Sequence, residues 1–171
     1  MIIKLLGMMV ILFSSVAMGF RMADNMASRE SELRNLSDAV TLMLGELGYT
    51  HLSIKDIFVK VMPFVKGEVD ELFRNICTEL EKGESASCAW ADAVVKSAQF
   101  LPFKASDCAI LEKSGYLLEA YGLEEQKTNL NALKQRVDSL VCDAEEFKKK
   151  NSRIARMLGI YGGLLLCIIV F

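Results

Sequence analysis

Apolar residues gather in two runs at the ends of the chain, and both runs lack charge. Leu5–Phe20 and Met157–Phe171 contain no Asp, Glu, Lys or Arg. At 1.5 Å per helical residue they extend about 24 Å and about 23 Å, slightly short of a hydrocarbon core of about 30 Å. Ile2 and Ile3 extend the first run, and Ile154 with Ala155 extends the second while Arg156 snorkels. The pattern predicts two minimal transmembrane segments.

Between the two runs, apolar positions recur three and four residues apart, which is typical of amphipathic helices. The first helix is expected at about 28–48, and the second is capped by Ser53 and ends near Pro63. A third follows Gly67 and stops at Gly83, and a fourth opens at Ser85 or Ser87 and ends before Pro102. A fifth is capped by Ser106 and ends at Gly122, and a sixth runs from about Leu123 into the membrane. No strand is predicted.

The number of helices bears on the fold class. A chain that leaves a membrane and returns to the same face does so after an even number of antiparallel rods. We therefore predict an all-α protein: an antiparallel bundle of about six helices flanked by an N-terminal and a C-terminal transmembrane helix. The expected divisions are 1–21 (transmembrane), 22–150 (cytosolic bundle) and 151–171 (transmembrane), with the first and last helices neighbours and each nearly continuous with a span.

Charge is distributed unevenly along the chain of 171 residues. Residues 22–147 contain 22 acidic and 13 basic residues, a net charge of −9, whereas residues 148–156 carry +5. An acidic body makes nucleic-acid binding unfavourable, since phosphate contacts need the opposite sign. A basic collar next to a span suits anionic lipid headgroups. The predicted collar comprises Arg21, Lys148, Lys149, Lys150, Arg153 and Arg156.

The collar also favours one topology. Lys4, the apolar run and Ala17-Met18-Gly19 together resemble a cleaved signal peptide. Cleavage would leave the middle of the chain outside and the basic collar on the outer face, against the positive-inside rule. We expect an uncleaved hairpin with the middle of the chain in the cytosol and both termini outside. Five scattered cysteines without CxxC spacing agree with a reducing compartment and are expected to be small buried hydrophobes.

The turns at the two ends of the bundle differ in chemistry. Those near 63–67 and 100–104 are expected to face the bilayer, where they either close the core or contact a membrane partner. Their residues are Phe64, Lys66, Phe103 and Lys104. The turns at the far end form an acidic rim, either a solvated surface or a docking site for a basic partner. The rim comprises Glu46, Tyr49, His51, Glu81, Glu84, Glu119, Tyr121, Glu124 and Glu125.

Residue patterns that carry catalysis or bind cofactors are missing from the sequence. His51 is the only histidine and has no neighbouring cysteine or clustered carboxylate, so no metal site is predicted. No Gly-rich phosphate loop, GxSxG, HExxH or Cys-His arrangement occurs. Trp90, the only tryptophan, is expected to be a core or interface anchor. We predict no enzyme activity and no cofactor; a small membrane enzyme would need a perturbed carboxylate or a bound metal.

Several residues carry a family resemblance through their order and spacing. They are Gly19-Phe20 with Arg21, 29–33, 43–46 with Tyr49 and Leu52, Ala89-Trp90, Leu111 with Gly115, Gln126, and Leu158-Gly159 with Gly162-Gly163. Their order, which covers nearly the whole chain, resembles the stage III sporulation protein AB family of endospore-forming bacteria. The likeness departs at LLEAYGLEEQ, where the family tends to have Leu-Gly and then Asp before the Gln.

The resemblance implies a non-enzymatic platform in the mother-cell membrane facing the forespore. Its bundle would be similar to the F-protein domains of type II secretion machines, within a secretion-like channel required for endospore formation. The implied partners are a cytosolic secretion-type ATPase, sporulation protein AA, and the other stage III sporulation membrane proteins. The alternative is a generic hairpin scaffold or adaptor of a divisome or secretion system, which would not bind a secretion ATPase.

Overall fold

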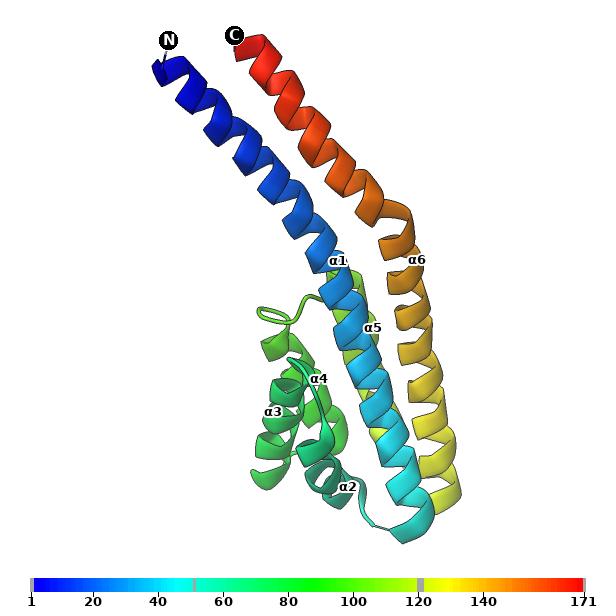
Figure 1. Ribbon diagram of the computed structural model, residues 1–171. Helices are drawn as coiled ribbons and strands as arrows, with labels where there is room; N and C mark the ends of the chain where they lie inside the picture. The colour runs from blue at the N-terminus through cyan, green and yellow to red at the C-terminus, as the bar shows by residue number, and fades with distance from the viewer. Residues whose placement is uncertain (1, 51, 120–121, 171) are drawn as a thin grey trace. The chain divides into compact units, whose positions relative to one another are not determined.

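The computed structural model describes residues 2–50, 52–119 and 122–170, and these residues are predominantly helical (Figure 1). The α-helices are α1 (Ile2–Thr50), α2 (Ile54–Val61), α3 (Val69–Glu81), α4 (Ala86–Ser97), α5 (Ala105–Lys113) and α6 (Leu123–Val170). Two 3₁₀-helices, η1 (Met62–Phe64) and η2 (Ser114–Leu118), follow α2 and α5. The all-α prediction is confirmed, and each expected span is continuous with the first or last helix of the bundle.

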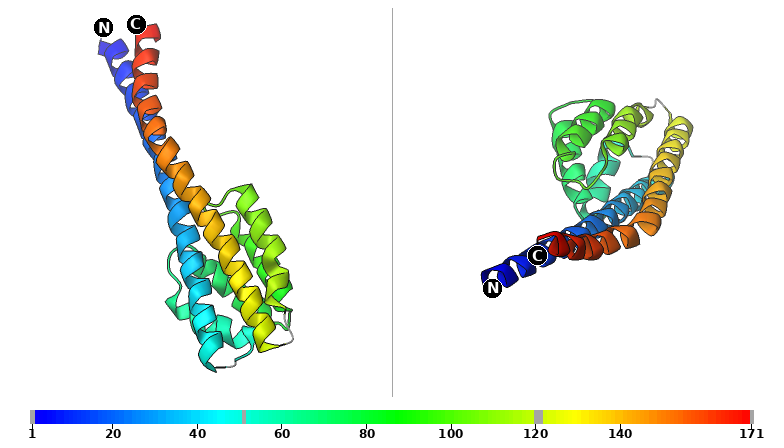
Figure 2. Two further views of the ribbon diagram at one scale, coloured as in Figure 1. Left: turned by 90° about the vertical axis from the view of Figure 1, so that its right-hand side faces the viewer. Right: turned by 90° about the horizontal axis from the view of Figure 1, so that it is seen from above.

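The chain forms two compact units, to both of which α1 and α6 contribute. Unit 1 contains residues 1–30 and 143–171, and unit 2 contains residues 31–142. In unit 1, α1 and α6 run antiparallel and side by side, so that both chain ends lie at the same end of the pair (Figure 2). Unit 2 surrounds a core with the remaining parts of α1 and α6 and all of the short helices.

The core of unit 2 is centred on aromatic rings. Trp90 is fully buried, and its indole N–H donates to the Leu111 carbonyl at 2.7 Å. The Phe58 ring lies between Phe73 and Trp90, with centroid distances of 5.5 Å and 6.4 Å, as tilted aromatic pairs prefer. The prediction that Trp90 anchors a core is confirmed.

Local signals explain most helix boundaries. Ser53 and Ser85 cap α2 and α4 by accepting from the backbone N–H of Asp56 and Cys88. Gly67 and Gly83 adopt positive φ angles of 72° and 94°, which a side chain would disfavour. The first turn of α3 is capped from a distant helix, because Glu32 of α1 accepts from the Val69 N–H at 3.2 Å.

The predicted fifth helix is wrong at both ends. Ser106 is not its cap: the Asp107 carboxylate reaches back to accept from the Lys104 N–H at 2.9 Å, so the helix begins at Ala105. It ends at Lys113 rather than Gly122, and η2 follows. Gly115 of η2 packs so tightly that an added Cβ would lie 2.9 Å from the Ser87 carbonyl oxygen and 3.3 Å from Trp90. This tertiary contact favours the tighter 3₁₀ winding over continued α-helix.

Candidate membrane helix pair and charged surfaces

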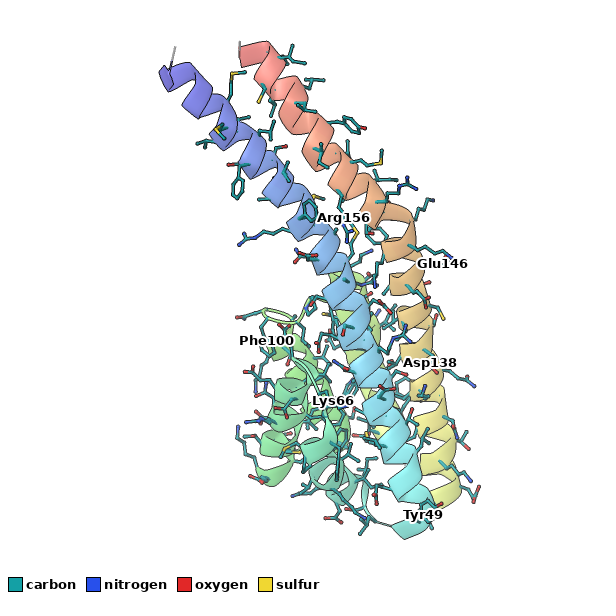
Figure 3. All side chains as sticks on the ribbon, viewed as in Figure 1. Tyr49, Lys66, Phe100, Asp138, Glu146 and Arg156 are labelled. Atoms are coloured by element: carbon teal, nitrogen blue, oxygen red, sulfur yellow. The ribbon has the colours of Figure 1, made fainter. Side chains whose placement is uncertain are left out.

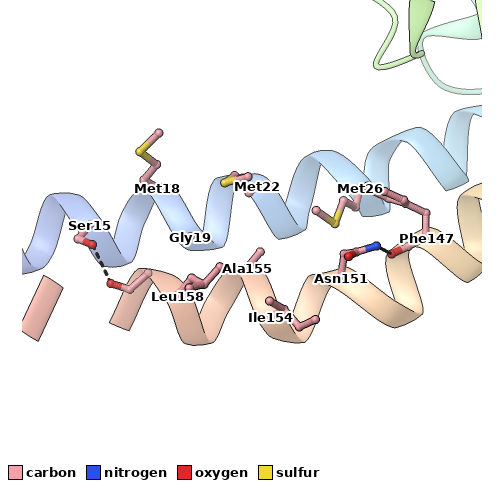
Figure 4. A pocket seen from close by; sticks show the side chains of 11 residues that line it. Ser15, Met18, Gly19, Met22, Met26, Phe147, Asn151, Ile154, Ala155 and Leu158 are labelled. Atoms are coloured by element: carbon pink, nitrogen blue, oxygen red, sulfur yellow. Dashed lines mark hydrogen bonds between the residues drawn. The ribbon is translucent and has the colours of Figure 1, made fainter. Parts of the chain in front are cut away.

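The two helices of unit 1 approach most closely at a pair of glycines. A Cβ added to Gly19 would lie 2.8 Å from the Ala155 carbonyl oxygen and 2.9 Å from the Gly159 Cα. A Cβ added to Gly159 would lie 2.9 Å from the Gly19 Cα. The Ser15 hydroxyl donates to the Gly159 carbonyl at 2.8 Å (Figure 4). Small residues and a hydroxyl at a close crossing are typical of helix pairs packed in lipid.

Further contacts follow the pair in both directions. Towards the chain ends, Gly163 faces Ser15, and the Cys167 thiol donates to the Met8 carbonyl at 3.5 Å. In the other direction, Lys148 pairs with Glu30 at 2.7 Å. The expected collar residue Lys148 is therefore engaged within the helix pair.

Both long helices are apolar enough to cross a membrane. Their best 18-residue windows have mean hydropathies of 1.3 and 1.5, and only 11% and 22% of these windows is buried within the structure. Core helices of soluble proteins are mostly covered by protein, whereas these surfaces are left for another environment. The exposed apolar side chains fit lipid.

The other collar residues are exposed on the two helices. Arg21, Lys149, Lys150, Arg153 and Arg156 all face outward. The Arg156 guanidinium lies 5.7 Å from the centre of the Phe20 ring. Arg156 directly precedes the apolar run of α6, and Phe20 is the last residue of the apolar run of α1. Figure 3 labels Arg156 on α6.

An apolar groove of about 410 Å³ runs beside the glycine contact (Figure 4). On α1 it is lined by Met18, Met22 and Met26, which are spaced four residues apart and share one helical face. On α6 it is lined chiefly by Phe147, Ile154 and Leu158. Sequence reasoning missed this groove, although the methionine spacing was a visible signal.

Most of the expected acidic rim lies at the end of unit 2 where α1 ends and α6 begins. The turn between α3 and α4 lies at the same end (Figure 1). Tyr49 is 90% exposed there (Figure 3). The exposed carboxylates are Glu81, Glu84, Glu119, Glu124 and Glu125. Glu46 differs because it is half-buried and pairs with Lys60 at 2.5 Å. His51 and Tyr121 lie outside the described residues.

The two turns at the opposite end of unit 2 differ in how far their aromatic side chains are exposed. Phe64 is 67% exposed, so the expectation that it closes the core is wrong. η1 turns its ring outward beside a hollow of about 310 Å³ that Leu42 and Lys66 also line. Phe103 is half-buried, and Lys66 and Lys104 are exposed. Lys66 and Phe100 mark these turns in Figure 3.

One polar cluster in unit 2 has the residue types of a serine nucleophile with a base. Ser37 donates to Asp138 at 2.6 Å, and Lys134 donates to Ser37 at 2.9 Å and to Asp138 at 2.6 Å. Burial favours the neutral Asp138 carboxyl, but the bonds from Lys134 and Ser37 outweigh it and lower its pKa. Each of the three side chains is thus held by hydrogen bonds to the other two. The cluster joins α1 to α6.

A second cluster holds α3 to α4. The Glu79 side chain is 12% exposed and accepts from Lys96 at 2.6 Å and from Lys82 at 3.1 Å. These hydrogen bonds, that from Lys96 first, lower the pKa of Glu79. Among the described residues, no three His, Cys, Asp or Glu side chains are grouped closely enough to hold a metal ion.

The cysteines are only partly as expected. Cys77 and Cys167 are buried, whereas Cys88 and Cys142 are exposed and Cys108 is half-buried. Burial, followed by the charge of a neighbouring carboxylate, raises the pKa of both Cys77 and Cys108. These two thiols are consequently poor nucleophiles at neutral pH.

These features define a class: an all-helical protein with two long terminal helices that are able to cross a membrane and pack closely through glycine, and a bundle that contains the short helices. Comparison with known proteins identifies the family. The profile of stage III sporulation protein AB matches residues 4–171, and the chain belongs to this family. Membership supports a role in sporulation.

Two relatives agree with the assignment. The stage III sporulation protein AB of Bacillus subtilis (strain 168) is 27% identical over 169 residues, covering 98% of this chain and 99% of the relative. A solved structure of a stage III sporulation protein AB has a TM-score of 0.63 at 23% identity, covering 71% of this chain and 96% of that one. At this identity the structural likeness establishes the fold alone.

Proposed function

We propose that the chain is a non-enzymatic platform of a secretion-like channel between mother cell and forespore, required for endospore formation. The two long apolar helices anchor it in the mother-cell membrane, and unit 2 stands in the cytosol. Family membership supports the sporulation role, and the exposed apolar surfaces of α1 and α6 support the anchoring. The positive-inside rule applied to the collar supports the cytosolic side.

The observation that carries the platform role is the acidic end of unit 2. Five exposed glutamates come from two parts of the chain that are distant in sequence: Glu81 and Glu84 from the turn between α3 and α4, and Glu119, Glu124 and Glu125 from around the start of α6. Like charges gathered from separate segments cost some stability, and an opposite surface on a partner would compensate for it. The proposed partner is the cytosolic secretion-type ATPase, sporulation protein AA.

The opposite turns are proposed to meet the other stage III sporulation membrane proteins. Phe64 and Lys66 provide an exposed aromatic ring beside a positive charge, and Phe103 with Lys104 provides a second, less exposed pair. Aromatic side chains on a surface are frequent anchors of protein interfaces. Soluble and membrane-bound partners would then bind opposite ends of unit 2.

Neutralising the acidic rim tests the ATPase contact. Glu84→Gln, Glu119→Gln and Glu124→Gln together should reduce binding of the purified ATPase about tenfold at low salt, because electrostatic steering and rim pairing are lost. Glu46 is left intact because it pairs with Lys60. The matched control replaces the exposed carboxylates of Glu71, Asp92 and Glu112, which lie outside the rim.

Surface plasmon resonance with the full chain in detergent micelles measures both triple variants. Equal affinities for the rim variant, the control and the unsubstituted chain would rule out the proposed contact. Absence of ATPase binding by all three would leave a generic scaffold as the better description.

Cysteine labelling tests the topology. Cys88 and Cys142 are exposed in unit 2 and are better probes than the half-buried Cys108. With the other cysteines replaced by Ser, a membrane-impermeant maleimide should label Cys88 in inside-out vesicles and not in intact cells. Labelling in intact cells would place unit 2 outside and contradict the proposal.

A further inference from the structure

Two hollows of unit 1 share Phe147 as a lining residue. The first is the apolar groove between α1 and α6. The second, of about 560 Å³, is lined by Phe147 together with Asp143, Glu146, Lys149 and Lys150. Phe147 thus lines both an apolar groove and a hollow that carries charges of both signs.

The groove crosses the level at which the membrane boundary is expected. Its deep end, at Ser15 and Gly159, lies within the uncharged runs, and its outer end, at Phe147, lies beyond Arg156. Gly159 and Phe147 are separated by about 18 Å along α6. Measured from residue 151, where the expected span begins, Gly159 lies about 12 Å inside and Phe147 about 6 Å outside. Since the headgroup layer is about 5–8 Å thick on each side, the deep end faces acyl chains and the outer end faces headgroups.

Residue chemistry changes in a definite order along α6. Leu158 and Ile154 are apolar, Lys150 and Lys149 follow one turn further out, and Glu146 and Asp143 follow them. An occupant that complements this order has a hydrocarbon tail, then an anion, then a cation. A phospholipid with a zwitterionic headgroup has its groups in this order, because its phosphate lies next to the glycerol and its amine lies outermost.

The geometry points to a binding site for phosphatidylethanolamine on unit 1. One acyl chain lies in the groove along Met18, Met22 and Leu158, the phosphate pairs with Lys149 and Lys150, and the primary ammonium pairs with Glu146 and Asp143. The inference rests on the membrane anchoring proposed above and adds a preferred lipid to it.

Two other headgroups fit less well. Phosphatidylglycerol would satisfy the lysines but would leave Asp143 and Glu146 facing a negative headgroup. Phosphatidylcholine has the same charges as phosphatidylethanolamine, but its quaternary ammonium has no N–H to donate to a carboxylate. A protein helix in the groove would cover the apolar lining without any headgroup preference.

Native mass spectrometry of the full chain in detergent micelles measures the preference directly. The probes are phosphatidylethanolamine, phosphatidylglycerol and phosphatidylcholine, each with palmitoyl and oleoyl chains. Phosphatidylethanolamine should be retained up to about fivefold more than either other lipid, since an exposed ion pair contributes at most about a fivefold factor.

Two substitutions test the ammonium contact and the phosphate contact of the headgroup separately. Glu146→Gln should abolish the preference over phosphatidylglycerol, and Lys150→Gln should weaken retention of all three lipids. Asp24→Asn, which removes an exposed carboxylate that lines neither hollow, is the matched control and should keep the preference.

The result that overturns the inference is equal retention of the three lipids, or stronger retention of phosphatidylglycerol by the unsubstituted chain. Carbonate extraction of vesicles containing the chain is run in parallel. A chain that resists extraction but shows no lipid preference refutes only the lipid site, whereas a chain released by carbonate refutes the membrane anchoring of the proposed function.

Discussion

Units 1 and 2 join the same two helices in opposite ways. In unit 1, α1 and α6 touch backbone to backbone at Gly19 and Gly159, and the large side chains beside the contact face outward. In unit 2, large side chains such as Leu36 and Leu133 are fully buried. Burial of apolar area stabilises proteins in water but supplies no force between helices in lipid, where close packing and hydrogen bonds remain. Under the proposed membrane anchoring, different forces therefore hold the two helices together in unit 1 and in unit 2.

The largest effect is expected where water drives packing. Trp90→Ala removes the largest buried side chain of unit 2 and the hydrogen bond to Leu111. The free energy of unfolding of the bundle should fall by about 3–5 kcal/mol. Urea unfolding followed by circular dichroism measures it, and Val95→Ala on the exposed side of α4 should change it by less than about 0.5 kcal/mol. Comparable losses for both variants would contradict the assignment of the core.

The second-largest effect is expected at the backbone contact between α1 and α6 in unit 1. Gly19→Leu places a side chain against the Ala155 carbonyl and should cost about 1–3 kcal/mol by overpacking. Gly7→Leu is the control, because nothing lies within 4 Å of a Cβ added there. Electron–electron distance measurements between spin labels at the exposed positions Phe13 and Leu165 should lengthen for Gly19→Leu alone. An unchanged distance would mean that the glycine contact does not hold the pair.

A smaller, pH-dependent effect distinguishes unit 2. The folded pKa of Glu79 lies below its ordinary value of 4.5 because Lys96 and Lys82 donate to the carboxylate. Its contribution to stability is therefore complete above pH 4.5 and is lost as the pH falls through the folded pKa. Glu79→Gln should flatten the acid branch of the stability profile, measured by urea midpoints between pH 6 and pH 3. If the acid branch of Glu79→Gln is as steep as that of the unsubstituted chain, other carboxylates cause the loss of stability at low pH.

The smallest effect is expected from the hydroxyl in unit 1. Ser15→Ala removes the hydrogen bond to Gly159 and keeps the close approach, so it should cost only about 0.6 kcal/mol. Equilibrium unfolding in mixed micelles measures it, with Ser14→Ala at a neighbouring exposed position as the control. A loss as large as that of Gly19→Leu would show that hydrogen bonding, and not close packing, dominates the contact.

Much of the fold was predictable because the deciding signals are local. Ser53, Ser85, Gly67 and Gly83 act within a few residues of themselves, and the helix boundaries near them were predicted correctly. The end of the fifth helix was not predicted correctly, since the tight contact of Gly115 with Ser87 and Trp90 depends on another helix. The candidate rim was largely identifiable from charge, but the pairing of Glu46 with Lys60 required coordinates.

What the sequence by itself determined is the all-helical class, the two apolar ends, the charge segregation and the family, because these depend on composition, periodicity and residue order. Only the tertiary structure decided which glycine meets which, that the methionines of α1 line a groove with Phe147, and that Phe64 faces outward. Such features arise where side chains from distant segments compete for the same space, and a linear pattern does not record that competition.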